Sequence, residues 1–483
     1  MAEAETRVAI IGAGWAGIQL LQSLQELGID AEVFDKLNAV GGTWTPQMSY
    51  SGLSLHSPRW INGISSHGKI FPWVKDDDES WHSKPDAQEV HTYLNDYVDH
   101  HGLRSKIHCN AFITEICHCS KSQQVHVKVQ LNGQLVQRGP FTLVVFSAMS
   151  GKASMPRIPN NKFEGRVLHS HEVKDEVLKE VVKKNLRVLI LGGGKSGCDM
   201  IQACQKMNHS NLIWLMRAPY WFMRHEAVSH RRTLLGKLRA FLVLTTVPWF
   251  LLKPRVGIFL TWLLGVLIQP AQKGLPAHFD PSRFHLGILD RSQEAFIKKV
   301  TPKIGEPKSL EKEGMVLESG EKLPCDVVVY ATGYETGFDD IRTVKDGEEV
   351  DVRDDPLYHH TVAPRFPSLL VAPTAYTNFG PIRGVTMAQY ITYYLAAKPS
   401  EAEMLRVARK NWCKQRPKQF LLFGGQVFMR EYLYMFLDFV RGGILPFSWL
   451  LKAIWDLFIN NLYRPLPLSV GVQQQWLGGA PYS

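Results

Sequence analysis

The fold is decided by residues 7–35, which read RVAIIGAGWAGIQLLQSLQELGIDAEVFD. The stretch begins with a short apolar run typical of a buried strand, Arg7–Ile11, and continues with the glycine spacing GxGxxG. Isoleucine and leucines at helical spacing follow, and a second apolar run, Ala31–Phe34, completes a strand–helix–strand unit. This order is typical of a dinucleotide-binding unit and predicts an α/β protein.

Each glycine of this motif has a physical task. Gly12 allows the tight turn, Gly14 lets the backbone approach a pyrophosphate, and Gly17 lets helix and strand pack closely. The helix N-terminus offers free N–H groups and a positive dipole to the phosphates. Asp35 directly follows the second strand, where it can accept hydrogen bonds from a ribose diol and would repel a 2′-phosphate. The first site is therefore predicted to bind FAD or NAD and not NADP.

The same pattern returns in residues 186–197, which read LRVLILGGGKSG. An apolar strand again leads into glycines in GxGxxG register, here Gly192, Gly194 and Gly197. Ser196 adds a hydroxyl that could reach a phosphate. A second dinucleotide site is therefore predicted.

Arg217 distinguishes the second site from the first. It follows the next predicted strand, residues 211–216, at the position where the first unit has Asp35. An arginine fork matches a 2′-phosphate, whereas an aspartate would oppose one. The alternative is an ordinary surface arginine. The second site is predicted to bind NADPH, and the two units together predict a flavoprotein that NADPH reduces.

Further elements make the chain resemble the flavin-containing monooxygenases, the class B flavoprotein monooxygenases, and among them the plant and bacterial type. Gly41–Trp44 matches the family's GG-x-W element. Phe163–His169 matches a signature that normally ends in an aromatic residue, for which this chain has Val173. Asp326–Tyr334 matches a late A-T-G-Y element. The cofactor-binding residues that the resemblance adds are Gly42, Thr43, Trp44, Thr332 and Gly333.

The resemblance implies two nested Rossmann-type domains, one for FAD and one for NADPH. We expect residues 1–155 to form the first part of the FAD-binding domain and residues 156–325 to form the NADPH-binding domain. Residues 326–483 would then return to the FAD-binding domain and add C-terminal helices, with the strand after Asp326 marking the return. Gly380-Pro381 either starts a further inward-pointing helix or forms a plain turn.

The chemistry implied by the resemblance begins when NADPH reduces FAD. The reduced flavin then captures O2 as a C4a-hydroperoxide, which oxygenates a soft nucleophile, an amine nitrogen or a sulfide sulfur of a small, lipophilic molecule. The alternatives are Baeyer–Villiger oxygenation of a carbonyl, an uncoupled NADPH oxidase that releases H2O2, and a catalytically silent FAD-binding protein. Val173 counts against the Baeyer–Villiger alternative. A disulfide reductase is set aside, because no redox cysteine pair follows the first helix.

Two polar residues are the candidates for a catalytic role. His56 lies in LHSPR, which resembles the L-H-x-P-[KR] stretch of plant and bacterial relatives. It could hydrogen-bond to flavin, NADP+ or the peroxide, or it could be a structural loop histidine. Asn62 is the second candidate.

The excess of basic residues and the apolar runs predict that the chain associates with a membrane surface. Lysine and arginine (55) exceed aspartate and glutamate (45), which suits nucleic acid, an anionic membrane or phosphorylated cofactors. No basic-aromatic motif of a nucleic-acid-binding module is present. An insertion over about 218–285 contains two apolar runs, Phe241–Leu252 and Val256–Ile268, which follow a basic cluster. Each is shorter than the roughly 20 residues that span a bilayer. We expect either an interfacial helix pair or a buried helical cap, and Phe447–Asn460 is a second amphipathic candidate.

Seven cysteines without a C-x-x-C pair predict no metal site and a reducing compartment. The acidic N-terminal residues lack the basic region of a signal peptide, so secretion is not expected. The predicted location is the cytoplasmic side of a membrane, the endoplasmic reticulum membrane in a eukaryote. The predicted partners are a small-molecule substrate, O2, the membrane surface and a second copy of the chain in a homodimer.

Overall fold

The computed structural model describes most of the two predicted domains. The described residues are 6–55, 59–66, 69–73, 83–147, 152–217, 221–224, 284–335, 340–353, 355–359, 361–371, 380–411 and 448. His56, both apolar runs of the insertion and, apart from Ser448, the predicted C-terminal helix lie outside these residues. In the described part of the chain, no helix combines the length and apolar character that crossing a bilayer requires.

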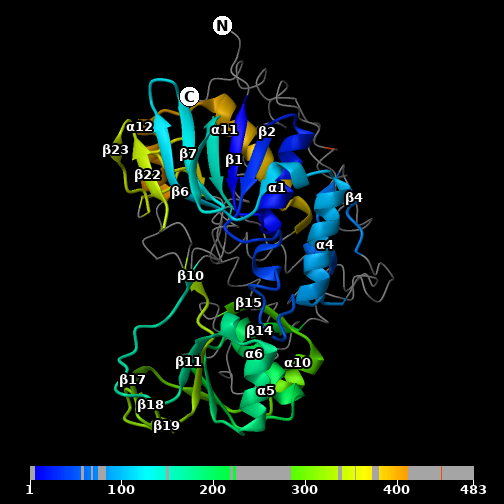
Figure 1. Ribbon diagram of the computed structural model, residues 1–483, viewed down its shortest axis with the longest axis vertical. Helices are drawn as coiled ribbons and strands as arrows, with labels where there is room; N and C mark the ends of the chain where they lie inside the picture. Colours follow the sequence, from blue (N-terminus) through cyan, green and yellow to red (C-terminus); the bar gives the residue numbers. More distant parts are fainter. Residues whose placement is uncertain are drawn as a thin grey trace.

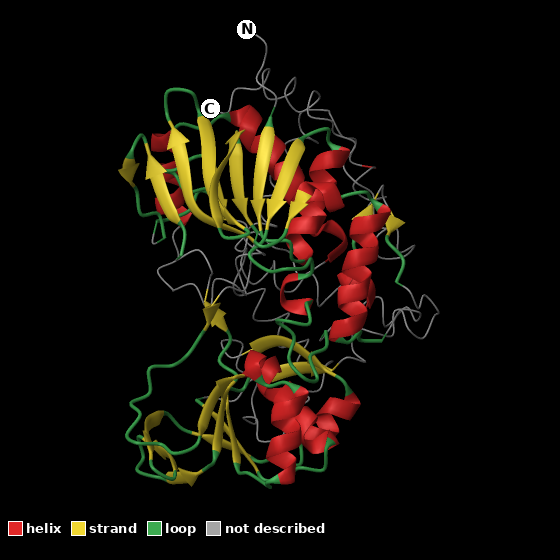
Figure 2. Cartoon of the chain, viewed as in Figure 1, coloured by secondary structure: helices red, strands yellow, loops and turns green. Residues whose placement is uncertain are grey.

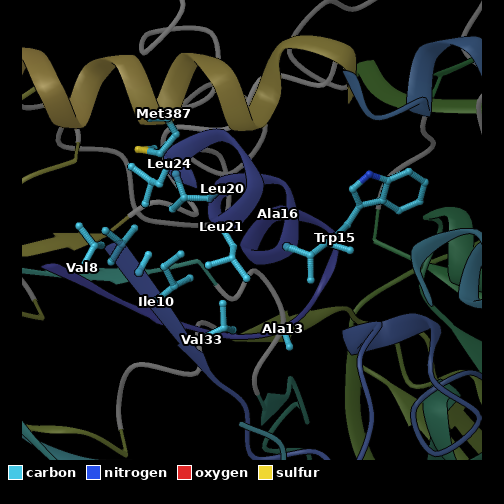
Figure 3. Close-up of a cluster of buried hydrophobic side chains, with 14 of the residues drawn as sticks. Val8, Ile10, Ala13, Trp15, Ala16, Leu20, Leu21, Leu24, Val33 and Met387 are labelled. Atoms are coloured by element: carbon cyan, nitrogen blue, oxygen red, sulfur yellow. The ribbon is translucent and has the colours of Figure 1, made fainter. Parts of the chain in front are cut away.

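The first domain is built on the predicted parallel sheet (Figures 1 and 2). Its strands, in spatial order, are β24 (Leu369–Val371), β9 (Leu143–Phe146), β1 (Arg7–Ile11), β2 (Asp30–Phe34) and β5 (Ile107–His108). Helix α1 (Trp15–Glu26) packs on this sheet, and α11 (Gly380–Ala397) packs on α1. A Cβ atom on Gly384 would lie 2.6 Å from the Gln19 carbonyl oxygen, so the backbones of α11 and α1 nearly touch. Figure 3 shows Leu24 between Met387 and the strand residues Val8 and Ile10.

Helix boundaries follow from local chemistry. Helix α1 begins at Trp15, because the extended backbone of Gly14 caps it, and so it starts about a turn before Ile18, the first residue of the predicted helix. Helix α11 begins at Gly380, with Pro381 in its first turn, where proline's missing N–H is tolerated. Helix α4 (Ala87–His100) begins with a capping box, in which Asp86 and Glu89 each bond to the other's backbone N–H.

A second sheet completes the first domain. Its strands, in spatial order, are β23 (Glu348–Glu349), β22 (Arg342–Lys345), β6 (Ala111–Cys119), β7 (Gln124–Leu131) and β8 (Gln134–Phe141). All neighbours are antiparallel except β22 and β6. Smaller elements of this domain are η1 (Gly42–Trp44), α2 (Arg59–Asn62), β3 (Ser65–Ser66), β4 (Lys69–Ile70), η2 (Arg104–Lys106) and α12 (Glu401–Asn411).

The second domain contains another parallel sheet. Its strands, in spatial order, are β11 (Arg166–His169), β20 (Val327–Tyr330), β12 (Val188–Leu191), β13 (Leu212–Met216) and β16 (Pro302–Ile304). Its remaining described elements are η3 (Ser170–Glu172), α5 (Asp175–Lys183), α6 (Lys195–Lys206), β14 (Trp221–Arg224), β15 (Phe284–Leu289), α10 (Arg291–Ile297), β17 (Pro307–Glu311), β18 (Gly314–Leu317) and β19 (Lys322–Pro324). Helix α6 contacts β12, α5 and α10. Across both domains, the six cysteines of the described residues are free thiols.

The position of β20 corrects the expected domain boundary. This strand pairs in parallel with β11 and β12, so Val327–Tyr330 lies in the middle of the second sheet and does not return to the first. The return occurs afterwards, at β21 (Tyr334–Glu335), which pairs with β10 (Lys152–Ala153). Figure 1 shows this two-stranded ribbon between the two domains. The boundary predicted between residues 325 and 326 is therefore wrong, because an apolar run fits either sheet and only its partners decide.

Candidate functional site

The first glycine-rich loop packs as tightly as its motif requires. A Cβ atom on Gly17 would lie 1.8 Å from the Gly12 carbonyl oxygen, a distance at which atoms overlap. Ser147 Oγ donates to the carbonyl oxygens of Ile11 (2.8 Å) and Gly12 (3.1 Å) and holds the end of β1. The free N–H groups at the start of α1 are thereby kept at the carboxyl end of the sheet, where such folds bind phosphates.

The GG-x-W element lies directly against this loop. Gly41 N donates to the Ala13 carbonyl oxygen (2.9 Å). Gly42 has a positive φ of 58°, and a Cβ atom on it would lie 3.0 Å from Gly14 Cα. Two bare backbones therefore meet at the N-terminus of α1, and side chains on either would fill the space in front of it.

Thr43 and Trp44 continue this element as η1. The Trp44 ring packs edge-on to Trp15, with ring centroids 6.3 Å apart. Trp73 and Tyr93 stack on each other next to Trp15, with a centroid distance of 3.7 Å, so an aromatic cluster supports the loop from the α4 side. Sequence reasoning did not find this cluster, because its members come from separate segments.

Asp35 is buried at the end of β2 and faces the first loop. Its carboxylate accepts hydrogen bonds from Ala13 N (2.5 Å) and Leu37 N (2.7 Å). Burial raises the pKa of this carboxyl above its ordinary value, although the two backbone N–H groups act against the shift. Hydroxyl donors such as a ribose diol would stabilise its charged form further, and the contact of Asp35 with a ribose stays a prediction.

The second glycine-rich loop repeats the tight packing of the first. A Cβ atom on Gly197 would lie 2.3 Å from the Gly192 carbonyl oxygen. Gly192 has a φ of 135°, and a Cβ atom on it would lie 2.3 Å from the carbonyl oxygen of Ala331, the residue after β20. Gly194 caps α6 with extended backbone. The second loop therefore repeats the shape of the first.

Thr332 and Gly333 connect Ala331, which lies against the second glycine-rich loop, to β21 of the two-stranded ribbon. Thr332 Oγ1 donates to the Ser154 carbonyl oxygen (2.5 Å), and Ser154 N donates to the Gly333 carbonyl oxygen (2.9 Å). Both residues thus hydrogen-bond the two segments of chain that run between the domains to each other. A direct contact of either with a cofactor stays a prediction.

Arg217 follows the end of β13 and is exposed, and no acidic side chain among the described residues pairs with it. Its guanidinium is therefore available to an anion, in contrast to the buried carboxylate of Asp35. Asn62 is buried at the end of α2, a helix that contacts α11. His56 lies outside the described residues, and a catalytic role for either candidate stays a prediction.

Polar residues that the sequence motifs did not reveal connect the segment after the GG-x-W element to α6. Asp199 on α6 is fully buried and accepts hydrogen bonds from Tyr50 Oη (2.8 Å) and Gln293 Nε2 (2.7 Å). It also pairs with Lys195. The one signal for this network in the sequence is the spacing of Lys195 and Asp199, which places the two side chains on one helix face.

A histidine pair lies next to the chain crossing. His169 Nε2 is 2.9 Å from the Gly333 carbonyl oxygen and therefore carries the proton that it donates. His169 Nδ1 lies 2.7 Å from His171 Nδ1, and the ring of His169 packs against Tyr334. Burial, and next the neighbouring His171, lower the pKa of His169 to about 4, so the pair is neutral at pH 7.

The fold and its two loops define a class: α/β proteins with two nested dinucleotide-binding domains. A family model described as flavin-binding monooxygenase-like (FMO-like) matches residues 5–247. The chain belongs to this family.

Curated relatives share limited identity with the chain. A 4-hydroxybenzoate brominase (decarboxylating) from Pseudoalteromonas luteoviolacea is 22% identical, over 68% of this chain and 63% of the relative. A senecionine N-oxygenase from Tyria jacobaeae is 26% identical, over 44% of this chain and 48% of the relative. A flavin-containing monooxygenase 3 from Macaca mulatta is 24% identical, over 68% and 62%. The chain thus spans about half to three fifths of the length of these relatives.

Two solved structures share this fold. A complex of OTEMO with FAD and NADP superposes with a TM-score of 0.61 at 17% identity and covers 84% of this chain and 88% of that one. An open form of cyclohexanone monooxygenase gives a TM-score of 0.58 at 16% identity and covers 91% and 98%. At such identities the likeness shows the shared fold.

Proposed function

We propose that this chain is an FAD- and NADPH-dependent monooxygenase that oxygenates the nitrogen of an amine or the sulfur of a sulfide. The observation that carries the proposal is the pair of residues that follow the second strand of each dinucleotide-binding unit. The first loop has a buried carboxylate, Asp35, and the second has an exposed guanidinium without an acidic partner among the described residues, Arg217. One site suits a ribose diol and the other a 2′-phosphate.

The first site fits FAD. The bare backbones of Gly14 and Gly42 leave room at the N-terminus of α1 for a pyrophosphate, and Asp35 is placed for the ribose. Once reduced, a bound flavin supplies the activation of O2 that oxygen transfer requires. The chain itself would orient the flavin and exclude water, with the aromatic cluster behind Trp44 as the rigid support.

The second site fits NADPH. The N–H groups at the start of α6 would hold its pyrophosphate, and Arg217 would hold its 2′-phosphate. Lys195 sits in the first turn of α6 but pairs with Asp199 inside the protein, so it is already neutralised. Discrimination between NADPH and NADH therefore rests on Arg217.

Two features support oxygenation of a soft nucleophile. One relative is named a senecionine N-oxygenase, a name that states oxygenation at nitrogen. Val173 occupies the position where the family signature normally ends in an aromatic residue, which counts against Baeyer–Villiger oxygenation, and it is buried in the second domain's core. We propose a small, lipophilic substrate, because the residues between β14 and β15 are rich in apolar side chains.

The assignment is tested by anaerobic mixing of the purified, yellow protein with NADPH or NADH. We expect NADPH to bleach the flavin, and amines or sulfides supplied in air to be oxygenated in proportion to NADPH consumed. Consumption of NADPH that yields only H2O2, across amines, sulfides and ketones, would indicate an uncoupled oxidase. Flavin that NADPH cannot reduce would indicate a silent binding protein.

We further propose that the chain lies on the cytoplasmic face of a membrane, which in a eukaryote would be the endoplasmic reticulum membrane. The support is the basic cluster Arg224–Arg239, which precedes the two apolar runs of residues 241–268. Deletion of residues 241–268 should abolish co-sedimentation with anionic liposomes, and unchanged binding would refute the proposal. We also propose a homodimer, which a mass measurement by light scattering tests.

A further inference from the structure

A loop of the first domain is built into the core of the second. We name residues 46–53, which follow the GG-x-W element closely, the clasp loop. Tyr50 and Leu53 of this loop belong to the same buried cluster as Met200 of α6. A Cβ atom on Gly52 would lie 3.3 Å from Ala203 Cβ, so the loop lies on the surface of α6. The clasp loop therefore joins the element beside the first glycine-rich loop to the helix behind the second.

One side of the clasp loop is bonded to the segment after η3. Ser51 N donates to the Val173 carbonyl oxygen (3.0 Å). Lys174 Nζ donates to the carbonyl oxygens of Gln47 (3.1 Å) and Ser49. The clasp loop contributes backbone groups to these bonds, so this side of the loop is held through its main chain.

The other side of the clasp loop is bonded through side chains to α6. Tyr50 Oη donates to Asp199 Oδ2 (2.8 Å), and Ser196 Oγ lies 3.3 Å from the same phenol oxygen. Asp199 Oδ1 accepts from Gln293 Nε2 (2.7 Å) and from Lys195 Nζ. The carboxylate is thus held by three donors, and Tyr50 is the donor that crosses between the domains.

Lys84 provides a second crossing to the same network. Its Nζ lies 2.5 Å from Asp290 Oδ2 and 3.5 Å from Gln293 Oε1. The amide of Gln293 therefore links Lys84 of the first domain to Asp199 of the second. The network balances two ammonium groups with two carboxylates, which burial demands of charged side chains. Its members have few alternative arrangements, so the network holds the domains in one relative position.

We propose that Tyr50 and Asp199 are positioning residues that set the relative position of the two glycine-rich loops. The proposal rests on the proposed function, in which a hydride passes between cofactors held by different domains. Hydride transfer needs reacting atoms within about 3–3.5 Å, and a displacement of about 1 Å can cost about 100-fold in rate. A single phenol–carboxylate bond between the clasp loop and α6 can therefore control the reaction without touching either cofactor.

The test uses Tyr50→Phe, which removes the hydroxyl and keeps the buried ring. In anaerobic stopped-flow mixing we expect the limiting rate of flavin reduction by NADPH to fall by roughly 10- to 100-fold. FAD content and reduction by dithionite should stay at the wild-type level, because the first site is intact. Asp199→Asn keeps the shape of the side chain but weakens the hydrogen bonds that three donors make to it. It should also lower the limiting rate of flavin reduction.

Tyr394→Phe is the matched control. Tyr394 is as deeply buried as Tyr50, and its hydroxyl donates to the Pro367 carbonyl oxygen (2.7 Å) within the first domain. This variant loses one buried phenol bond without loosening the domains. We expect it to reduce its flavin at the wild-type rate, and an equal slowing of both variants would overturn the proposal.

Hydrogen exchange of the protein without cofactors gives a readout besides activity. In Tyr50→Phe the Ser51 amide should exchange about 10-fold faster than in the wild type, because loss of a bond to a carboxylate frees the clasp loop. Unchanged exchange at Ser51, or a wild-type reduction rate, would overturn the proposal. A wild-type protein that NADPH does not reduce would instead refute the proposed function, while the exchange result still decides whether Tyr50 holds the loop.

Discussion

Acidification should destabilise the second domain through His169. This side chain is fully buried, and its pKa is lowered to about 4 by burial and by the nearby His171, against an ordinary value of 6.5. Its two ring nitrogens are engaged by the Gly333 carbonyl oxygen and by His171 Nδ1. Protonation of His169 would place a second N–H against His171 and a charge in a buried site.

The sign and size of the effect follow from linkage. A histidine whose folded-state pKa is depressed contributes stability above its unfolded pKa of 6.5, and that contribution is lost as the pH falls from 6.5 towards 4. Between pH 7.5 and pH 5.0 the unfolded state gains the proton and the folded state does not. About 1.5 pH units at about 1.4 kcal/mol each give a loss of about 2 kcal/mol. The pKa of His171 is also lowered by burial and adds in the same direction.

Urea unfolding of the wild type and of His169→Gln at the two pH values measures this loss. Glutamine keeps a donor for the Gly333 carbonyl oxygen but does not titrate, so the variant should lose about 2 kcal/mol less than the wild type on acidification. The exposed His100, changed to glutamine, is the control and should leave the wild-type pH dependence intact. An undiminished pH dependence in His169→Gln would refute the reasoning.

Three further predictions concern the loops and the core. Gly17→Ala should destabilise the first domain by about 1–3 kcal/mol and lose flavin, because its Cβ would overlap the Gly12 carbonyl oxygen. Gly14→Ala should fold normally but bind little flavin. Circular dichroism measures the folding of both variants, and absorbance measures their flavin content. Arg217→Ala should raise the Kd for NADPH by about 10- to 100-fold and leave that for NADH unchanged, and equal effects on both would contradict its role. Val173→Ile should raise the free energy of unfolding by about 0.5–1 kcal/mol by filling a cavity of about 10 Å³ beside it, and a lower value would show that the site is already full.

Local patterns predicted the elements that local forces determine. The runs Arg7–Ile11 and Ala31–Phe34 became β1 and β2 because apolar β-branched residues and glycine spacing act over short distances. The tight contacts of Gly17 and Gly197 were predictable for the same reason, since the motif itself encodes the close approach of helix and strand.

Features that depend on distant partners were not predictable. The run Val327–Tyr330 is apolar throughout, so its pattern fits the middle of either parallel sheet, and only its pairing with β11 and β12 places it. The bond between Tyr50 and Asp199 joins segments far apart in the chain, and a tyrosine in a loop gives no sign of the carboxylate that it will meet. The spacing of Lys195 and Asp199 places the two side chains on one helix face, but nothing in that spacing indicates that the structure buries the carboxylate completely.

We propose that two cofactor loops of opposite ribose chemistry serve one oxygen transfer. Turnover of a tertiary amine or a sulfide with NADPH under ¹⁸O2, followed by mass spectrometry of the product, tests this most directly. We expect one ¹⁸O atom in the N-oxide or S-oxide for each NADPH consumed. Unlabelled product, or NADPH consumption with ¹⁸O recovered only in hydrogen peroxide, would contradict it.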